Sequence, residues 1–222
     1  MDGNGRWATK KGLPRSLGHK KGAEVVEKIT KAAGDLGVKY LTLYAFSTEN
    51  WKRSEDEVST LMGLFRQYLK KDLEEIQKNN VRIKFIGEMN MLDKDIVESI
   101  KRIETNTAKN DGLVLCIAMS YGSRQEIVAT VKKLVTLVKR GDISENEIDE
   151  KTFSDMLYTS DMPDPDLVIR TSGEQRISNY LLWQIAYAEL FFTDVHWPDF
   201  DEKVLKEIID NYASRERRYG KA

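Results

Sequence analysis

The chain has 222 residues, which suits one large domain, and 41% of them are hydrophobic, enough for a substantial core. Its 35 basic and 36 acidic side chains nearly cancel, giving a formal net charge of −1. That balance argues against a protein that binds nucleic acid over its whole surface, and the hydrophobic content argues against disorder. The single cysteine, Cys116, excludes an internal disulfide framework and a cysteine-cluster metal site, and we expect its thiol to be buried and inert.

No stretch approaches the run of about 18 apolar residues that a transmembrane helix needs. The first 21 residues carry six basic groups against Asp2 alone and lack the apolar segment of a signal peptide. We therefore expect a soluble, cytoplasmic protein. The basic excess is either solvated surface or an electropositive site for a polyanion.

Apolar periodicity predicts alternating helices and strands. In chain order, the predicted elements are a helix over 20–36, a strand over 40–46, a helix over 54–79, a strand over 81–86, a helix over 93–109, a strand over 113–119, a helix over 122–140, a strand over 167–169 and a helix over 201–218. The pattern is clearest in 54–79, where an apolar stripe runs from Val58 to Ile76 and Ser54 with Glu57 predicts a capping box.

This alternation predicts a single α/β domain over 1–222, with a mostly parallel central sheet flanked by helices. Ligands of such sheets bind at the carboxyl ends of the strands. We therefore expect the chemistry in the loops that follow Phe46, Ile86, Met119 and Ile169.

The segment 2–7 (DGNGRW) is the first candidate site. Its glycines let backbone N–H groups approach a ligand, and Arg6 could clamp a phosphate. Asp2 is out of place in an anion site unless a cation joins it, so aspartate beside phosphate suggests Mg²⁺. An ordinary Asn-Gly turn is an equally good interpretation of the segment alone.

Two further segments follow predicted strands. The loop 47–53 (STENWKR), with its exposed aromatic side chain, is either a lid or a solvated loop with a helix cap. The segment 170–179 (RTSGEQRISN) is either a cradle for a second anion or a surface cluster of ion pairs.

Three single residues also need an explanation. Glu189 lies in the apolar stretch 180–192, so it must be paired, bound to metal or shifted in pKa, and a buried ion pair is the usual case. His19 suits either a phosphate contact or a helix cap, and His196 suits a structural role.

Together these segments resemble the cis-prenyltransferase family, and within it most closely the bacterial undecaprenyl diphosphate synthases. The resemblance spans essentially the whole chain. It is carried by 1–8 (MDGNGRWA), 18–24 (GHKKGAE), 41–53 (LTLYAFSTENWKR), 166–194 (DLVIRTSGEQRISNYLLWQIAYAELFFTD), 197–200 (WPDF) and 215–220 (RERRYG).

The resemblance implies a transferase that condenses isopentenyl diphosphate onto an allylic diphosphate, such as farnesyl diphosphate, and forms cis double bonds. It implies Mg²⁺ as cofactor, a homodimer, and a long polyprenyl product, undecaprenyl diphosphate, that supplies the cell-wall lipid carrier. The growing chain implies an apolar tunnel, for which the stripe from Val58 and the strand 113–119 are candidates, although core packing explains most of those side chains. Peripheral membrane contact for product release is left open.

Residue roles follow from the same resemblance. Asp2 and Asn50 are the expected catalytic residues, Asn50 as proton acceptor, and Asp2 and Glu189 are the expected metal ligands. The expected contacts of the allylic diphosphate are Gly3, Asn4, Gly5, Arg6, Trp7, Arg15 and His19. The expected mobile loop contributes Ser47, Thr48, Glu49, Trp51 and Arg53. The expected contacts of isopentenyl diphosphate are Arg170, Arg176, Ile177 and Ser178.

The sequence departs from the family pattern in two places. Many relatives have a histidine where this chain has Gln175, which puts an essential imidazole there in doubt. Family members also have a hydrophobic strand immediately before the aspartate, whereas only Met1 precedes Asp2 in this sequence. Either that strand is missing from it or the edge of the sheet is built differently; if the strand is missing, we expect Asp2 to be poorly anchored and activity to suffer.

Two other functions stay open. A non-catalytic partner subunit of a prenyltransferase would be expected to lose the aspartate and the arginine-rich loop, and this chain keeps both. A generic Mg²⁺-dependent phosphohydrolase would release phosphate without isopentenyl diphosphate.

Overall fold

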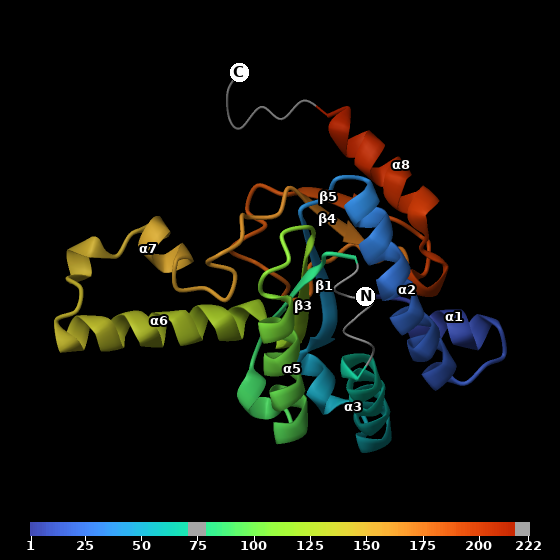
Figure 1. Cartoon of the computed structure of the whole chain (residues 1–222), viewed down its shortest axis with the longest axis horizontal. Coiled ribbons are helices and arrows are strands. Elements are labelled where there is room, and N and C mark those ends of the chain that lie inside the picture. The colour runs from blue at the N-terminus through green and yellow to red at the C-terminus, as the bar shows by residue number, and fades with distance from the viewer. Residues whose placement is uncertain (71–78, 216–222) are drawn as a thin grey trace.

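The computed structural model describes residues 1–70 and 79–215. Parallel strands form its centre, and helices pack around them (Figure 1). The strands are β1 (Tyr40–Ser47), β2 (Arg82–Ile86), β3 (Val114–Tyr121), β4 (Leu167–Arg170) and β5 (Glu189–Phe192). The helices are α1 (Asn4–Lys10), α2 (Arg15–Asp35), α3 (Glu55–Leu69), α5 (Lys94–Thr107), α6 (Ser123–Arg140), α7 (Glu150–Ser154) and α8 (Glu202–Ala213).

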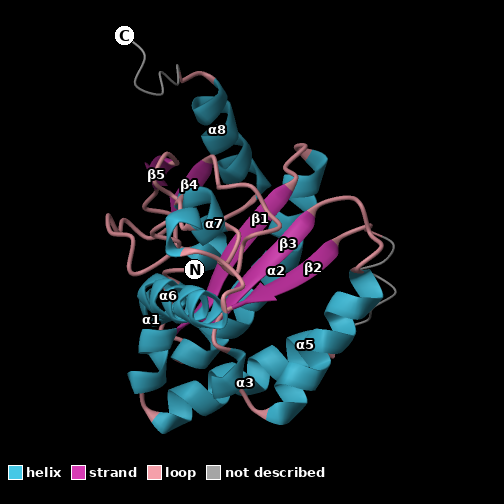
Figure 2. Cartoon of the chain, turned by 90° about the vertical axis from the view of Figure 1, so that its left-hand side faces the viewer, coloured by secondary structure: helices cyan, strands magenta, loops and turns pink. Residues whose placement is uncertain are grey.

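The predicted parallel α/β class is confirmed, with a difference in how the strands associate. Strands β1, β3 and β2 form one parallel sheet in that order, and β4 and β5 form a separate parallel pair. Figure 2 shows the three-stranded sheet with β4 and β5 set apart from it. Consecutive residues of β1 (40–45) and all of β4 line one large cavity of about 1110 Å³, so the edges of these two strands open onto a shared space.

Strand β3 is the centre of the core because it has a neighbouring strand on both edges. Leu115, Ile117 and Met119 pack into the cluster that α2, α3, α5 and α8 also build. Cys116 and Ala118 pack with Leu181 and Ile185 in a second cluster. Both faces are therefore covered, as the continuous apolar run 113–119 predicts.

The Cys116 thiol is fully buried, and burial raises its pKa to about 12, so the expected inert thiol is confirmed.

The element boundaries differ from the predictions where local signals were misread. The helix predicted from 20 begins at Arg15, directly after Pro14. Ser54 caps α3 by accepting from the N–H of Glu57, but the Glu57 side chain binds arginines instead of completing a capping box. Within the described ranges α3 ends at Leu69 and α8 at Ala213, and the parts of the predicted helices over 71–78 and 216–218 lie outside those ranges.

A search of the described residues finds no helix with the length and apolar character needed to cross a membrane.

Candidate active site

Asp2 is held between the two groups of strands. The amino group of Met1 donates to the carbonyl of Tyr44 on β1 at 2.5 Å. The carbonyl of Asp2 accepts from Thr171 Oγ1 at 2.9 Å and from the Trp197 N–H at 3.1 Å, and its carboxylate pairs with Arg170 Nε at 2.8 Å. These contacts place Asp2 where β4 ends.

Gly3 is required by the turn that leads into α1. Its φ of 104° lies in the left-handed region, and a Cβ there would meet Ser172 Oγ at 2.1 Å. Ser172 is in turn held by His196 Nδ1 at 2.9 Å. The pair Ser172–His196 thus supports the turn beside Asp2, which agrees with the structural role expected of His196.

Helix α1 packs tightly against α2 through the glycine at position 18. A Cβ at Gly18 would meet the backbone oxygen of Asn4 at 2.0 Å, so only glycine allows this approach. Asn4 Oδ1 and His19 Nε2 are buried without a hydrogen-bond partner in the described residues. Such orphaned polar atoms are costly in a protein interior, so the two groups are available to a polar ligand.

Among the predicted contacts in the segment 2–7, Trp7 is the one whose side chain lies outside the site. Its indole N–H donates to Asp199 Oδ1 at 2.7 Å, and its side chain does not line the large cavity between β1 and β4.

Glu57 lies among three of the predicted site residues: Arg15 and His19, expected to contact the allylic diphosphate, and Arg53 of the expected mobile loop. Its Oε1 lies 2.8 Å from Arg53 Nη1, 3.3 Å from Arg15 Nη2 and 3.7 Å from His19 Nε2. Burial acts to raise the pKa of Glu57, but the charges of Arg53 and Arg15 outweigh it and lower the pKa overall. Three groups from α2 and the loop 47–53 therefore converge around one anion, a cluster that the sequence did not reveal.

The loop 47–53 is ordered as a short 3₁₀ helix over Thr48–Lys52. Asn50 Oδ1 accepts from the Ser47 N–H at 3.1 Å, and Trp51 Nε1 donates to Ser120 Oγ at 2.9 Å while its ring packs edge-on against Phe46. Trp51 is therefore half-buried, and the expectation of an exposed aromatic is wrong. Thr48 Oγ1 is buried without a partner in the described residues.

Arg170 joins Asp2 to the segment 176–178. Besides its contact with Asp2, its Nη1 donates to the carbonyl of Arg176 and, at 3.0 Å, to Ser178 Oγ. Its side chain is only 15% exposed. Glu174 binds both Arg6, at 2.8 Å, and Arg176. The second predicted anion cradle is thus assembled, with Arg170 paired to Asp2 and Arg176 paired to Glu174.

Glu189 lies apart from these groups. Its side chain pairs with Arg215 Nη1 at 2.6 Å, so the expected ion pair is present, but the side chain is 31% exposed and the expected burial is wrong. In the β4–β5 register Glu189 lies beside Leu167, whereas Arg170 lies beside Phe192, at the other end of the pair. Across the described residues no group of three or more His, Cys, Asp or Glu side chains is arranged to hold a metal ion.

The predicted site residues converge on the larger cavity. Those that line it are Asp2, Gly3, Asn4, Gly5, Arg6, Arg15, His19, Ser47, Glu49, Asn50, Arg53, Arg170, Arg176, Ile177 and Ser178. Trp7, Thr48, Trp51 and Glu189 do not.

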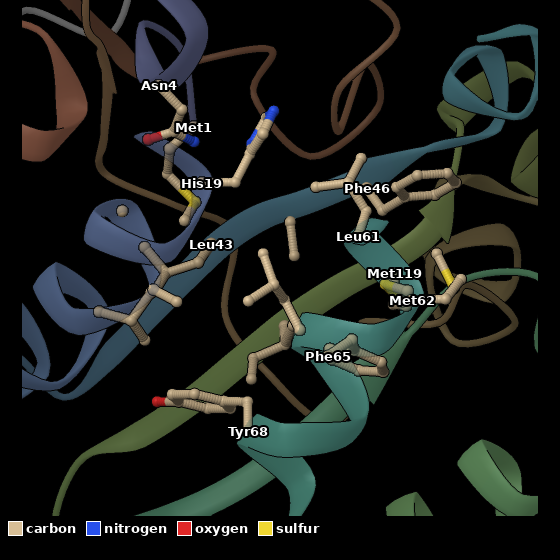
Figure 3. A pocket seen from close by; sticks show the side chains of 16 residues that line it. Met1, Asn4, His19, Leu43, Phe46, Leu61, Met62, Phe65, Tyr68 and Met119 are labelled. Carbon is tan, nitrogen blue, oxygen red and sulfur yellow. The ribbon is translucent and has the colours of Figure 1, made fainter. Parts of the chain in front are cut away.

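A smaller cavity of about 120 Å³ adjoins the larger one and shares its lining at Met1, Asn4, His19, Leu43 and Leu61. In Figure 3 Asn4 and His19 lie at one end of this cavity, Tyr68 lies at the other, and Leu61, Met62 and Phe65 project from α3. A polar mouth thus leads into an apolar interior. Val58 packs against the core instead.

Comparisons with known proteins match this chain over its whole length. A family model described as putative undecaprenyl diphosphate synthase matches residues 1–220. An isoprenyl transferase of Fusobacterium nucleatum is 53% identical over 99% of this chain and 93% of its own length, and one of Clostridium perfringens is 50% identical over 99% and 87%.

Solved structures show the same similarity. Lavandulyl diphosphate synthase from Lavandula x intermedia, in complex with dimethylallyl diphosphate, has a TM-score of 0.95 and 34% identity, covering 100% of this chain and 95% of its own. A probable undecaprenyl diphosphate synthase from Campylobacter jejuni has a TM-score of 0.81 and 34% identity, covering 91% and 93%.

Proposed function

Because the chain belongs to the undecaprenyl diphosphate synthase family and is therefore a cis-prenyltransferase, we propose that it extends farnesyl diphosphate to undecaprenyl diphosphate for the cell-wall lipid carrier. The observation that carries this proposal is that Asp2 and two groups of arginines, Arg15 with Arg53 and Arg170 with Arg176, line one cavity, with an apolar cavity adjoining it. Two diphosphates and a growing hydrocarbon need those three environments.

The allylic diphosphate takes the place that Glu57 occupies among Arg15, His19 and Arg53. A diphosphate carries more negative charge than one carboxylate, so it competes effectively for the two arginines. His19 is neutral near pH 7, because burial lowers its pKa more than Glu57 raises it, and it serves as a hydrogen-bond donor. The hydrocarbon then enters the apolar cavity past Asn4, and its tail lies against Leu61.

Isopentenyl diphosphate binds at Arg170, Arg176 and Ser178, with Ile177 exposed beside them. Bond breaking at the allylic C–O leaves negative charge on the departing diphosphate, which the facing arginines stabilise. The new C–C bond forms as the homoallylic double bond attacks, and the resulting cation loses a proton toward Asn50. Closure by the loop 47–53 excludes the water that would quench the allylic cation.

The chemistry of Asp2 suits Mg²⁺, which binds through one or two carboxylates together with substrate phosphates. Asp2 lies at the carboxyl end of β4, paired with Arg170, whereas Glu189 is paired with Arg215 at the far end of the strand pair. We propose Asp2 as the carboxylate beside the diphosphates and Glu189 as a second ligand supplied in the environment of a neighbouring subunit. When bound, the ion would neutralise charge on the leaving diphosphate.

A second candidate function is the synthesis of a short product, which the TM-score of 0.95 to lavandulyl diphosphate synthase favours. A non-catalytic subunit is disfavoured because Asp2, Arg170 and Arg176 are assembled around one cavity. We place the enzyme in the cytoplasm, with peripheral membrane contact limited to product release.

One assay separates these functions. The protein is incubated with farnesyl diphosphate, labelled isopentenyl diphosphate and Mg²⁺, and the labelled lipid is sized. We expect a product as long as undecaprenyl diphosphate. A short labelled product would support the second candidate, phosphate release without isopentenyl diphosphate would indicate a phosphohydrolase, and the absence of any labelled prenyl product would reject the synthase assignment.

The exposed face of α6 supports the proposed homodimer. Val128, Val131 and Val135 follow the spacing of one helix face and are 53%, 46% and 47% exposed. In Figure 1 this helix extends away from the central strands toward α7. A second copy would cover the stripe by placing the same face against it.

We expect sedimentation equilibrium to give twice the chain mass, and Val131→Asp to shift the mass to that of a monomer. Asn106→Asp adds the same charge to the exposed surface of α5 and is expected to leave the mass unchanged. A wild-type monomer, or an equal response of the two variants, would contradict this interface.

A further inference from the structure

Asn179 lies where the loop 47–53, the first turn of α6 and the segment 176–178 meet. Its backbone oxygen accepts from the N–H of Ser123 at 2.9 Å, and its Oδ1 accepts from the N–H of Arg124 at 2.8 Å. These are the first two N–H groups of α6, and Gly122 before them provides no side-chain cap. Asn179 therefore caps α6 from a distant segment of the chain.

The Nδ2 of the same side chain faces the predicted lid. It donates to Glu49 Oε1 at 2.9 Å and to Gln125 Oε1 at 3.1 Å. Burial raises the pKa of Glu49, but hydrogen bonds, first among them that from Asn179, outweigh it and lower the pKa overall. Glu49 thus acts as a charged acceptor for Asn179, and charge-assisted hydrogen bonds of this kind are the stronger ones.

The contacts of Asn179 with the loop 47–53 and with α6 form a closely packed junction, in which the backbone adopts left-handed conformations. Asn179 has a φ of 61°, and Ser178 before it has a φ of 50°. A Cβ at Gly122 would lie 2.5 Å from Thr48 Oγ1 and 2.8 Å from Asn179 Nδ2. The chain therefore accepts strained conformations here, which persist only where the surroundings hold them in place.

The neighbours of Asn179 in sequence bind Arg170. Arg170 Nη1 donates to Ser178 Oγ and to the carbonyl of Arg176. Hydrogen bonds and chain continuity therefore connect the segment 176–178, through Asn179, to Glu49, which is next to Asn50 in the loop. No other described side chain hydrogen-bonds to both the loop 47–53 and the first turn of α6.

We propose that Asn179 is a positioning residue that couples occupation of the isopentenyl diphosphate site to the loop carrying Asn50. It touches no reacting atom. By donating to Glu49 it holds the loop 47–53 in a fixed position relative to Arg176 and Ser178. Isopentenyl diphosphate and Asn50, the proposed proton acceptor, are thereby placed together. The proposal rests on the function assigned above to Arg170, Arg176 and Ser178.

Asn179→Asp isolates this contact. The carboxylate still accepts from Arg124 and suits a helix N-terminus, so the cap on α6 is kept. It can no longer donate to Glu49, and it places a second negative charge against it. We expect the KM for isopentenyl diphosphate to rise about tenfold or more, with less than a threefold change in the KM for farnesyl diphosphate. Asn146→Asp, the same change at an exposed site in the 3₁₀ turn Glu145–Glu147, is the control.

A reciprocal exchange tests the hydrogen bond itself. In Asn179→Asp with Glu49→Gln, the amide at 49 can donate to the carboxylate at 179, which restores the contact with donor and acceptor reversed. We expect the KM of the double variant for isopentenyl diphosphate to return most of the way to the wild-type value. We also expect the defect of Asn179→Asp alone to shrink as pH falls, because a protonated carboxyl can again donate to its neighbour.

Hydrogen exchange supplies a readout that does not depend on activity. The amides of 47–53 should exchange faster in Asn179→Asp and return to the wild-type rate in the double variant, with the melting temperature of both near that of the wild type. If wild-type protein forms no labelled product, the proposed function fails, while the exchange rates still test the junction. An unchanged KM and unchanged exchange in Asn179→Asp, or no recovery in the double variant, would overturn the proposal.

Discussion

Replacing Asp2 by Asn is expected to reduce kcat by about a thousandfold or more while leaving the fold intact. The change removes the charge that suits Mg²⁺, and the loss of one electrostatic contact to a developing charge commonly costs two to three orders of magnitude in rate (~10²–10³). The amide at position 2 can still accept from Arg170 Nε, so the half-buried guanidinium keeps a partner. Steady-state assays with farnesyl diphosphate and isopentenyl diphosphate measure the effect.

The loss should appear in kcat rather than in binding of the allylic substrate. Arg15, His19 and Arg53 lie around Glu57 and do not contact Asp2, so the KM for farnesyl diphosphate is expected to stay within about threefold. Asp142→Asn, at an exposed position after α6, is the matched control. Turnover of the Asp2 variant within tenfold of the wild type would remove Asp2 from the catalytic machinery.

The parts of the fold that could be predicted from sequence are those with strong local periodicity. Strands β1, β2 and β3 and helices α5 and α6 lie within one or two residues of the expected bounds, because each has an apolar pattern of the right period and a clear end. The loop 47–53 and the anion segment 170–179 are predictable because they follow strands β1 and β4, and parallel sheets bind their ligands at the carboxyl ends of strands.

The stretch 180–192 shows where local patterns fail. Its apolar residues suit a buried element, yet Leu181 has a φ of 46° and only Glu189–Phe192 form a strand, paired with β4 from more than eighteen residues earlier. Residues of β5 alternate between half-buried and exposed, which leaves Glu189 partly exposed beside Arg215. The conformation of 180–192 depends on the pairing of β5 with the distant strand β4, and this pairing cannot be predicted from local sequence.

The ion pairs between distant segments cannot be predicted from local sequence patterns. The spacing of three residues from Ser54 predicts that Glu57 completes a capping box, but Arg15 and Arg53 bind its carboxylate. Glu174 similarly binds Arg6 from the opposite end of the chain. A helix cap can be predicted from spacing within one turn, whereas these contacts depend on the packing of α1, α2 and β4.

The edges of β1 and β4 lie where an added strand could pair with both, and such a strand is expected to change stability and turnover. Both edges open onto the larger cavity, and Met1 and Asp2 already bridge them, Met1 to Tyr44 on β1 and Asp2 to Thr171 after β4. Residues appended before Met1 would run back along both strands, in an orientation parallel to them. Their backbone groups could pair with the edges of β1 and β4 that have no strand partner within the described residues, and so join the two groups of strands into one sheet.

We therefore expect about ten appended residues, with a β-branched apolar strand of about six leading into Met1, to stabilise the protein and raise its turnover. The extension replaces the buried amino group of Met1, whose pKa is lowered chiefly by burial, with a neutral peptide group. At about 1 kcal/mol net per hydrogen bond, several new ladder bonds should raise the melting temperature by about 5 °C or more. Firmer anchoring of Asp2 should increase kcat at least about threefold.

A Gly/Ser extension of the same length is the control, because it adds chain without a strand that can fill the cavity. Calorimetry and the product assay are run on both extended proteins and on the 222-residue chain. If the apolar extension matches the Gly/Ser extension in both melting temperature and turnover, the space between β1 and β4 does not accept a strand. If stability rises while turnover does not, Asp2 is already positioned by Arg170, Thr171 and Trp197, and the cavity between the sheets is separate from the chemistry.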